Sequence, residues 1–211
     1  MHTDVFLVRH GESYSNVEGR LCALPPGPGL TDRGRLQAEA AARQLIGRGV
    51  RPARIVSSPL RRALETAEPL ARATGLAIEV HDDLREITFG NWEGRTMDDI
   101  GALGEFRSWC LDPENCPPPG GETLSDVAGR VSRCMRRLAA LGAPGAIVGF
   151  SHMHPLIALM LEGRSQPFLG GGLSIVPNAA IVHVRVEQGD LRFVSLDPTA
   201  ADASGDLGLA L

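Results

Sequence analysis

The chain has 211 residues, of which 43% are hydrophobic, and its formal net charge is −4 at pH 7. This length suits one domain with a sizeable core, and the mild charge argues against broad binding to nucleic acid or an anionic membrane. No apolar run approaches the roughly 18 residues that a membrane span needs, and no signal-peptide pattern is present. We therefore expect a cytoplasmic protein.

Strand and helix patterns alternate through the first part of the chain. In chain order we expect a strand at 5–8, a helix between Asp32 and Gly47, a strand at 54–57, a helix at 60–74 and a strand at 77–80. Helical spacing predicts that the buried face of the first helix contains Leu36, Ala40, Leu45 and Ile46.

The middle of the chain, 82–121, is irregular and rich in turn-forming residues, with a short helical piece at 97–109. After it we expect a helix at 123–141, a strand at 146–150, a helix at 155–161 and a hairpin formed by 179–186 and 191–194. The alternation predicts an α/β fold, a three-layer sandwich whose mostly parallel central sheet is flanked by helices. We interpret 1–211 as a single domain in which 82–121 is an insertion that folds over the sheet.

Two predicted strands end in a histidine, His10 and His152. In open α/β sheets, ligands bind beyond the carboxyl ends of the strands, so parallel neighbouring strands would bring these histidines together. Arg9 directly precedes the first histidine, and the segment 58–63, Ser-Pro-Leu-Arg-Arg-Ala, follows a third strand. Packing of the hydrophobic core would not explain why these polar residues occur together at the strand ends.

Four motifs resemble those of the histidine phosphatase superfamily, the phosphoglycerate mutase-like clan, and they occur in the family's order. They are Arg-His-Gly-Glu-Ser at 9–13 with Asn16, the segment 58–63, Leu-Arg-Glu at 84–86 followed by Phe-Gly-Asn-Trp-Glu-Gly at 89–94, and Gly-Phe-Ser-His at 149–152. The resemblance covers residues 5 to about 160. It implies a phosphoglycerate mutase-like fold with His10 as nucleophile, Arg62 in the phosphate pocket, Glu86 as proton donor and His152 as a second pocket histidine.

These residue types suit attack on a phosphate monoester without a metal. Neutral imidazole can approach a dianion and form a phosphohistidine, while its other ring nitrogen donates to a backbone carbonyl. Arg9, Arg62 and a protonated His152 would stabilise the equatorial oxygens, and Asn16 would add a neutral donor. Glu86 would protonate the leaving group and then activate water, which requires its pKa to rise.

Several residues near the motifs have competing interpretations. Arg61 and Arg62 are adjacent at a helix start, so we expect only one of them to enter the pocket. The resemblance implies Arg62, which leaves Arg61 solvated. Glu93 and Glu12 compete with Glu86, but they fit a turn residue and a helix-start residue.

Cys22 is interpreted as a loop residue that touches the substrate. The role of His154 is left open between a helix-start residue, a neighbour of the site and a substrate-facing residue. His152 and His154 form a His-x-His pair without a third ligand at fitting spacing, so we expect no metal and no cofactor.

Two enzymes share this catalytic core, a phosphatase and a cofactor-dependent phosphoglycerate mutase. Mutases of the family are longer and carry a Thr/Ser-Gly pair after the asparagine, where this chain has Arg-Leu-Cys-Ala at 20–23. We therefore expect a metal-independent, acid-type histidine phosphatase that acts on a small-molecule phosphomonoester, a metabolite or sugar phosphate. The mutase is the alternative, and a non-catalytic phospho-ligand-binding protein is disfavoured because every core residue is intact. The oligomeric state stays open, with a homodimer as one option.

Overall fold

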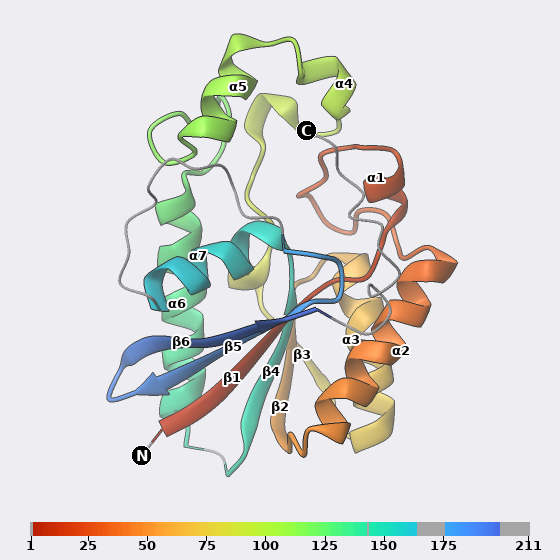
Figure 1. Cartoon of the computed structure of the whole chain (residues 1–211), viewed down its shortest axis with the longest axis vertical. Helices are drawn as coiled ribbons and strands as arrows, with labels where there is room; N and C mark the ends of the chain where they lie inside the picture. The colour runs from red at the N-terminus through yellow and green to blue at the C-terminus, as the bar shows by residue number, and fades with distance from the viewer. Residues whose placement is uncertain (1, 143, 164–175, 199–211) are drawn as a thin grey trace.

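The computed structural model describes residues 2–142, 144–163 and 176–198, and Figure 1 shows its arrangement. The C-terminal end of the predicted domain, 199–211, lies outside the described residues. The helices and strands are β1 (His2–Arg9), α1 (Tyr14–Val17), α2 (Asp32–Gly47), β2 (Pro52–Ser57), α3 (Arg61–Thr74), β3 (Ile78–Val80), α4 (Met97–Ile100), α5 (Gly104–Leu111), α6 (Leu124–Ala140), β4 (Ala146–Ser151), α7 (Met153–Gly163), β5 (Ile181–Glu187) and β6 (Asp190–Asp197), with two 3-10 turns, η1 (Asp82–Leu84) and η2 (Gly90–Trp92).

The strands form one six-stranded sheet in the order β3-β2-β4-β1-β5-β6. The first four strands of this order are parallel, β5 runs antiparallel to β1, and β6 pairs antiparallel with β5. The predicted fold class is therefore confirmed. Arg9 pairs with Ser151 and Ser57 pairs with Phe150, so β1, β4 and β2 end at nearly the same level.

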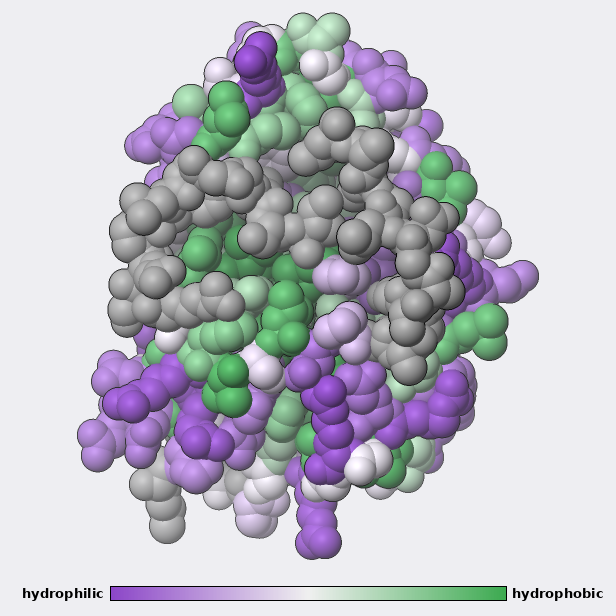
Figure 2. All heavy atoms as spheres, in the orientation of Figure 1, coloured by the Kyte–Doolittle hydropathy of each residue, from purple (hydrophilic) through white to green (hydrophobic). Residues whose placement is uncertain are grey.

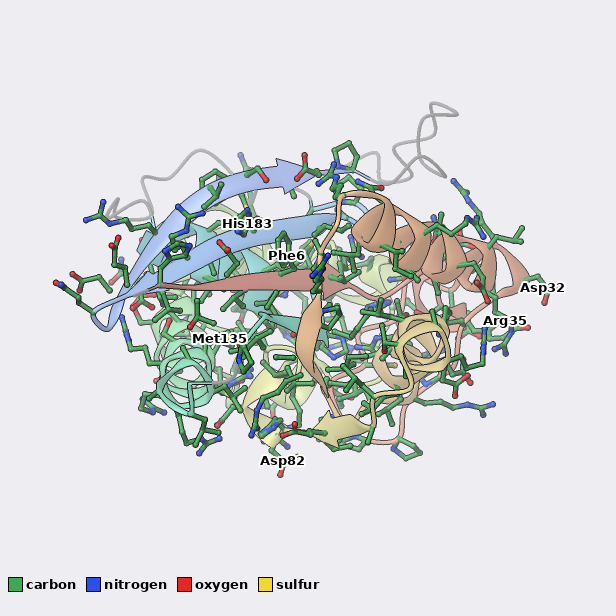
Figure 3. The ribbon with its side chains drawn as sticks, turned by 90° about the horizontal axis from the view of Figure 1, so that it is seen from below. Phe6, Asp32, Arg35, Asp82, Met135 and His183 are labelled. Atoms are coloured by element: carbon green, nitrogen blue, oxygen red, sulfur yellow. The ribbon has the colours of Figure 1, made fainter. Side chains whose placement is uncertain are left out.

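Alternate side chains of the strands fill two cores, one on each face of the sheet. Val8 and Val148 pack with α2 and α3 on one face, whereas Leu7 and Ile147 pack with α6 and α7 on the other. Figure 3 shows Phe6 and His183 together on one side of β1 and Met135 of α6 on its other side. The rings of Phe6 and His183 are stacked, with their centroids 4.3 Å apart. The helices thus cover both faces and leave the ends of the strands for a site.

The predicted buried face of α2 is wrong in part. Leu36 and Ile46 are exposed, Ala40 is half-buried, and of the four predicted residues only Leu45 is buried. The alanines of this helix fill the contact instead, because small side chains let α2 approach α3 closely. The buried residues of α2 are Gly34, Gln37, Ala38, Ala41, Ala42 and Leu45.

The segment 82–121 lies beyond the carboxyl ends of the parallel strands, where Figure 1 places α4 and α5. We call this segment the cap. Its aromatic side chains make edge and tilted contacts with one another and belong to the same core as α6 and α7. They are Phe89, Trp92, Phe106 and Trp109.

The opposite end of the sheet has a different character. Figure 2 shows hydrophilic side chains gathered around the lower part of this face and hydrophobic ones near its middle. A shallow cavity of about 410 Å³ lies at the amino ends of the strands, away from both predicted site histidines, and is lined by residues that include His2, Asp4, Arg48 and Ala146.

None of the helices in the described ranges has the length and apolar character needed to cross a bilayer.

Candidate active site

The site is built at the carboxyl ends of three neighbouring strands. His10, Ser58 and His152 are the first residues after β1, β2 and β4. The peptide N–H of His10 donates to Ser151 O at 2.9 Å, and that of Ser58 donates to Phe150 O at 2.9 Å. These bonds extend the sheet by one residue, so the side chains that follow are held firmly. The imidazole centroids of His10 and His152 are 5.1 Å apart.

The hydrogen bonds of His10 define which ring nitrogen carries its proton. Nδ1 lies 2.7 Å from Gly11 O, and a carbonyl oxygen only accepts, so Nδ1 is the donor. Nε2 lies 3.0 Å from Nε of Arg62, which is always a donor. Nε2 therefore carries the lone pair, as a nucleophilic imidazole requires.

The ring of His10 is also held in its neutral form. Its pKa lies well below the ordinary value of 6.5, first because the ring is buried and then because Arg62 and Arg9 place positive charge beside it. The hydrogen bond to the Gly11 carbonyl opposes this effect only in part. A neutral ring at neutral pH keeps the lone pair of Nε2 free of a proton.

Arg62, and not Arg61, enters the site. Only 3% of Arg62 is exposed, and its Nη2 donates to Cys22 O at 2.8 Å. Its Nη1 is buried and makes no hydrogen bond within the described residues. Arg61 points to solvent and pairs with Glu65 at 2.7 Å. Arg62 thus offers one donor group to the nucleophile and another that is left for an oxyanion.

Arg9 and Asn16 border the same histidine in different ways. Arg9 is buried, and its guanidinium donates to the carbonyl of Val176. Asn16 is exposed, and its Oδ1 accepts from Ser13 N at 3.0 Å. The amide of Asn178 links the two regions, since it donates to His10 O at 3.0 Å and to Asn16 Oδ1 at 3.3 Å. The amide oxygen of Asn16 therefore orders the loop, which leaves its Nδ2 group for a ligand.

His152 differs from its prediction in one respect. It is fully buried, with Nε2 2.8 Å from Ser58 Oγ. Its pKa lies well below 6.5, first through burial and then through positive charge on Arg62 and other neighbours. The prediction of a protonated His152 is therefore wrong for the ligand-free site, because the ring lies among cationic groups that disfavour a further positive charge.

Glu86 also departs from the prediction. It is buried, and its Oε1 accepts from the peptide N–H of Ile87 at 2.9 Å and lies 3.0 Å from Nδ1 of His154. Burial alone would raise its pKa, but His154, the Ile87 N–H and the charge of Arg62 lower it to about 2. In the ligand-free site the pKa of Glu86 is therefore lowered and not raised as expected, because hydrogen-bond donors and the charge of Arg62 surround the carboxyl.

Arg130 of α6 holds the backbone around Glu86. Its Nη1 donates to the carbonyls of Asp83 and Arg85 at 2.7 Å each, and its Nη2 donates to Glu86 O at 3.0 Å. Its Nε pairs with Glu122 at 2.9 Å. The sequence interpretation missed this residue. Its spacing of three from Val127 places it on the buried face of the helix and is the signal that could have found it.

The two competing glutamates bind backbone or helix-start groups. Glu93 accepts from Ala23 N at 2.8 Å, and Glu12 accepts from Thr31 Oγ1 at 2.7 Å.

Cys22 is half-buried, and burial is the first reason that the pKa of its thiol is raised. Its contribution to the site in this structure is the carbonyl that binds Arg62.

Within the described residues, no group of three or more His, Cys, Asp or Glu side chains is arranged to hold a metal ion. The four cysteines of the chain are free thiols. Arg9, Arg62 and the imidazole of His152 lie around the ring of His10.

The chain is similar to several known proteins. It is 39% identical over 161 residues to the bifunctional protein Rv2228c of Mycobacterium tuberculosis, a match that covers 75% of the chain but 43% of that protein. The chain thus spans less than half of that relative. It is 32% identical over 187 residues to the adenosylcobalamin/alpha-ribazole phosphatase of Salmonella typhimurium, covering 88% of the chain and 86% of the relative.

Among solved structures, the fold is similar to that of the mycobacterial glucosyl-3-phosphoglycerate phosphatase. The TM-score is 0.79 at 32% identity, over 93% of this chain and 98% of the other. The sequence matches the family described as the histidine phosphatase superfamily (branch 1) over residues 5–198. With this match and the convergence of its motifs at one end of the sheet, the chain belongs to the histidine phosphatase superfamily.

Proposed function

We propose that this protein hydrolyses phosphate monoesters through a phosphohistidine formed on Nε2 of His10. The observation that carries the proposal is the pair of contacts on the His10 ring, Nδ1 to Gly11 O at 2.7 Å and Nε2 to Arg62 at 3.0 Å. Together they hold a neutral imidazole with its lone pair facing a buried guanidinium. This is the arrangement that a nucleophile for a dianionic phosphate needs.

The first step transfers the phosphoryl group to the enzyme. Nε2 of His10 forms a bond to phosphorus as the bond from phosphorus to the ester oxygen breaks, and the electron pair stays on that oxygen. Arg62 and Arg9 stabilise the charge on the equatorial oxygens. A bound dianion also raises the pKa of His152, so this ring gains its proton when the substrate arrives and not before.

The second step returns the enzyme to its starting state. The ester oxygen released in the first step takes a proton delivered through Glu86 and departs as the alcohol, and a water then attacks phosphorus. The water gives a proton to the same group, and the bond between phosphorus and Nε2 breaks. Protons thus pass to and from one group, and no metal takes part in either step.

The substrate class is a small metabolite or sugar phosphate. The named relatives support this proposal, because the alpha-ribazole phosphatase and the glucosyl-3-phosphoglycerate phosphatase both carry the name of a small organic phosphate substrate. The cap would select among such esters, since it lies beyond the carboxyl ends of the parallel strands and contains Glu86.

A phosphate-release assay over a panel of small phosphomonoesters, run in the presence of EDTA, tests the proposal. We expect hydrolysis that EDTA does not inhibit, and a loss of more than about 1000-fold in His10→Asn. The exposed His2→Asn is the matched control and retains activity. After brief mixing with a labelled ester, the wild type should carry label that acid removes and alkali does not, as for a phosphohistidine. Equal rates for wild type and His10→Asn would overturn the proposal.

A further inference from the structure

We propose that Glu86 and His154 form one proton-sharing pair, and that this pair, not Glu86 alone, is the acid and base of the reaction. The inference rests on the proposed phosphatase function and deepens it. His154 would then be a positioning and proton-storing residue that acts through Glu86. Its role was left open by the sequence.

The contacts between the two side chains are close and buried. Nδ1 of His154 lies 3.0 Å from Oε1 of Glu86, and the peptide N–H of His154 donates to the same oxygen at 3.2 Å. Only 2% of His154 and 7% of Glu86 are exposed. The N–H of Ile87 also binds Oε1, at 2.9 Å, so the contacts converge on one oxygen and leave Oε2 for the leaving group.

The other neighbours of the pair give the His154 ring no second polar partner. The ring lies against two aromatic side chains of the cap, Phe89 at a centroid distance of 6.0 Å and Trp109 at 5.4 Å. Its Nε2 is buried without a hydrogen-bond partner among the described residues. A proton on Nδ1 therefore has one acceptor within reach, the carboxylate of Glu86.

Among the described residues, two arginines act on the Glu86 side of the pair. Arg62 of α3 acts on the carboxylate through its charge, and Arg130 of α6 binds the Glu86 carbonyl. Arg62 and His154 lower the pKa of Glu86 to about 2. Near neutral pH, this carboxyl alone therefore has no proton to give. The proton that a leaving alkoxide needs can instead come from the imidazole of His154, whose Nδ1 lies 3.0 Å from Oε1 of Glu86.

The proposed step conserves protons and charge. The pair begins as carboxylate and imidazolium, with a net charge of zero. When the bond from phosphorus to the ester oxygen breaks, that oxygen takes one proton from the pair, which is left as carboxylate and neutral imidazole. The attacking water later returns one proton to the pair, and its oxygen becomes bonded to phosphorus.

Two esters with different leaving groups separate this role from a structural one. The leaving group of 4-nitrophenyl phosphate departs without a proton, whereas that of glycerol 2-phosphate requires one. In His154→Gln the amide can still donate to Glu86 but cannot store a proton. We expect kcat/KM for the alkyl ester to fall about 100-fold and that for the aryl ester to change little. We also expect the alkaline limb of the kcat/KM profile to move to lower pH.

Trp109→Phe is the matched control. It changes the aromatic contact with His154 but leaves the Glu86–His154 pair intact, so the ratio of the two kcat/KM values and the alkaline limb should stay as in the wild type. Equal losses on both esters in His154→Gln, with an unmoved alkaline limb, would overturn the inference and leave His154 a packing residue. Failure of the proposed function looks different, because the wild type and His10→Asn would then hydrolyse both esters equally.

A second measurement uses the wild-type protein and needs no change at His154. Nitrogen-15 NMR of the histidine rings reports whether both ring nitrogens carry protons. Because Nδ1 of His154 contacts Oε1 of Glu86, we expect the protonation state of the His154 ring to differ between the wild type and Glu86→Gln. The same protonation state in both proteins would overturn the inference.

Discussion

Arg62 donates from Nε to Nε2 of His10 at 3.0 Å, so in the ligand-free site the arginine occupies the lone pair that would attack phosphorus. A phosphoryl group that bonds to Nε2 of His10 must first displace the N–H of Arg62 from that nitrogen. The displaced N–H of Arg62 then faces the oxygens of the phosphoryl group. The buried Nη1 of Arg62 supplies a second donor to them. In the proposed mechanism, the contact marks where the transferred group would sit and which side chain would stabilise it.

Replacement of Arg62 by lysine should lower kcat/KM for phosphomonoesters by about 100- to 1000-fold, because an ammonium cannot reproduce the planar fork that reaches Nε2 and the Cys22 carbonyl together. Steady-state kinetics measure the loss. The adjacent Arg61→Lys is the control, since Arg61 is exposed and pairs with Glu65. Comparable kinetics for the two variants would show that the guanidinium of Arg62 has no special part in catalysis.

The positions of the strand ends could be predicted from the sequence because apolar β-branched runs stop at polar residues. His10 and His152 follow such runs, and the parallel pairing of β1 with β4 brings them together. Their roles come from the family resemblance, and they remain proposals. Local structure predicted that only one of Arg61 and Arg62 would enter the site, since adjacent residues on a helix face different directions, and the family resemblance implied Arg62.

Protonation could not be predicted in the same way, because it depends on neighbours that are far away in the chain. Arg62 lies 52 residues from His10 and 24 from Glu86, yet its charge acts on both side chains. His154 reaches Glu86 across 68 residues. Helical periodicity alone also misassigned Leu36 and Ile46, since it gives the direction of each side chain but not which neighbour the helix meets.

Gly34→Ala should destabilise the loop that carries His10. A Cβ at this position would lie 1.9 Å from Glu12 O, so the start of α2 and the segment after β1 would have to separate. We expect a lower Tm and a loss of activity, measured by thermal unfolding and phosphate release.

Gly47→Ala at the other end of α2 is the matched control. Its Cβ meets nothing within 4 Å, and alanine is the better helix former, so this variant should gain up to about 1 kcal/mol of unfolding free energy. If Gly34→Ala behaved like Gly47→Ala, the close approach of the two backbones would not constrain the site.

Arg130→Lys should weaken both the fold and the reaction. Lysine cannot bind Glu122 and the carbonyls of Asp83, Arg85 and Glu86 together, so buried acceptors lose their donors. We expect a loss of about 1–3 kcal/mol in the free energy of unfolding by urea and a lower kcat. Arg137→Lys on the same helix is the control, because Arg137 is exposed and meets Asp83 only at 3.5 Å. A kcat equal to that of the control would rule out a positioning role for Arg130.

Stability should fall as the pH drops below about 6.5, because the pKa values of His10 and His152 lie well below 6.5 in the folded protein. The unfolded chain binds protons at these rings as soon as the pH falls through 6.5, whereas the folded protein does not. Each ring therefore lowers the free energy of unfolding by up to about 1.4 kcal/mol per pH unit in this range. Below about pH 4.5, Glu86 adds to the decline, because the unfolded chain takes up a proton at this carboxyl at its ordinary pKa of 4.5, whereas the pKa of Glu86 in the folded protein is about 2.

Urea unfolding between pH 7 and pH 5 tests this prediction. The quantity compared is the slope of the free energy of unfolding against pH, which a constant loss of stability caused by the substitution itself does not change. His152→Asn removes one ring that cannot be protonated in the folded state, so its slope should be smaller than that of the wild type by up to about 1.4 kcal/mol per pH unit. His10→Asn should show the same change, and the double variant should be flatter still. Identical slopes in all four proteins would mean that the folded site accepts protons as readily as the unfolded chain. In that case Nε2 of His10 would itself be protonated in mild acid and unable to attack phosphorus there.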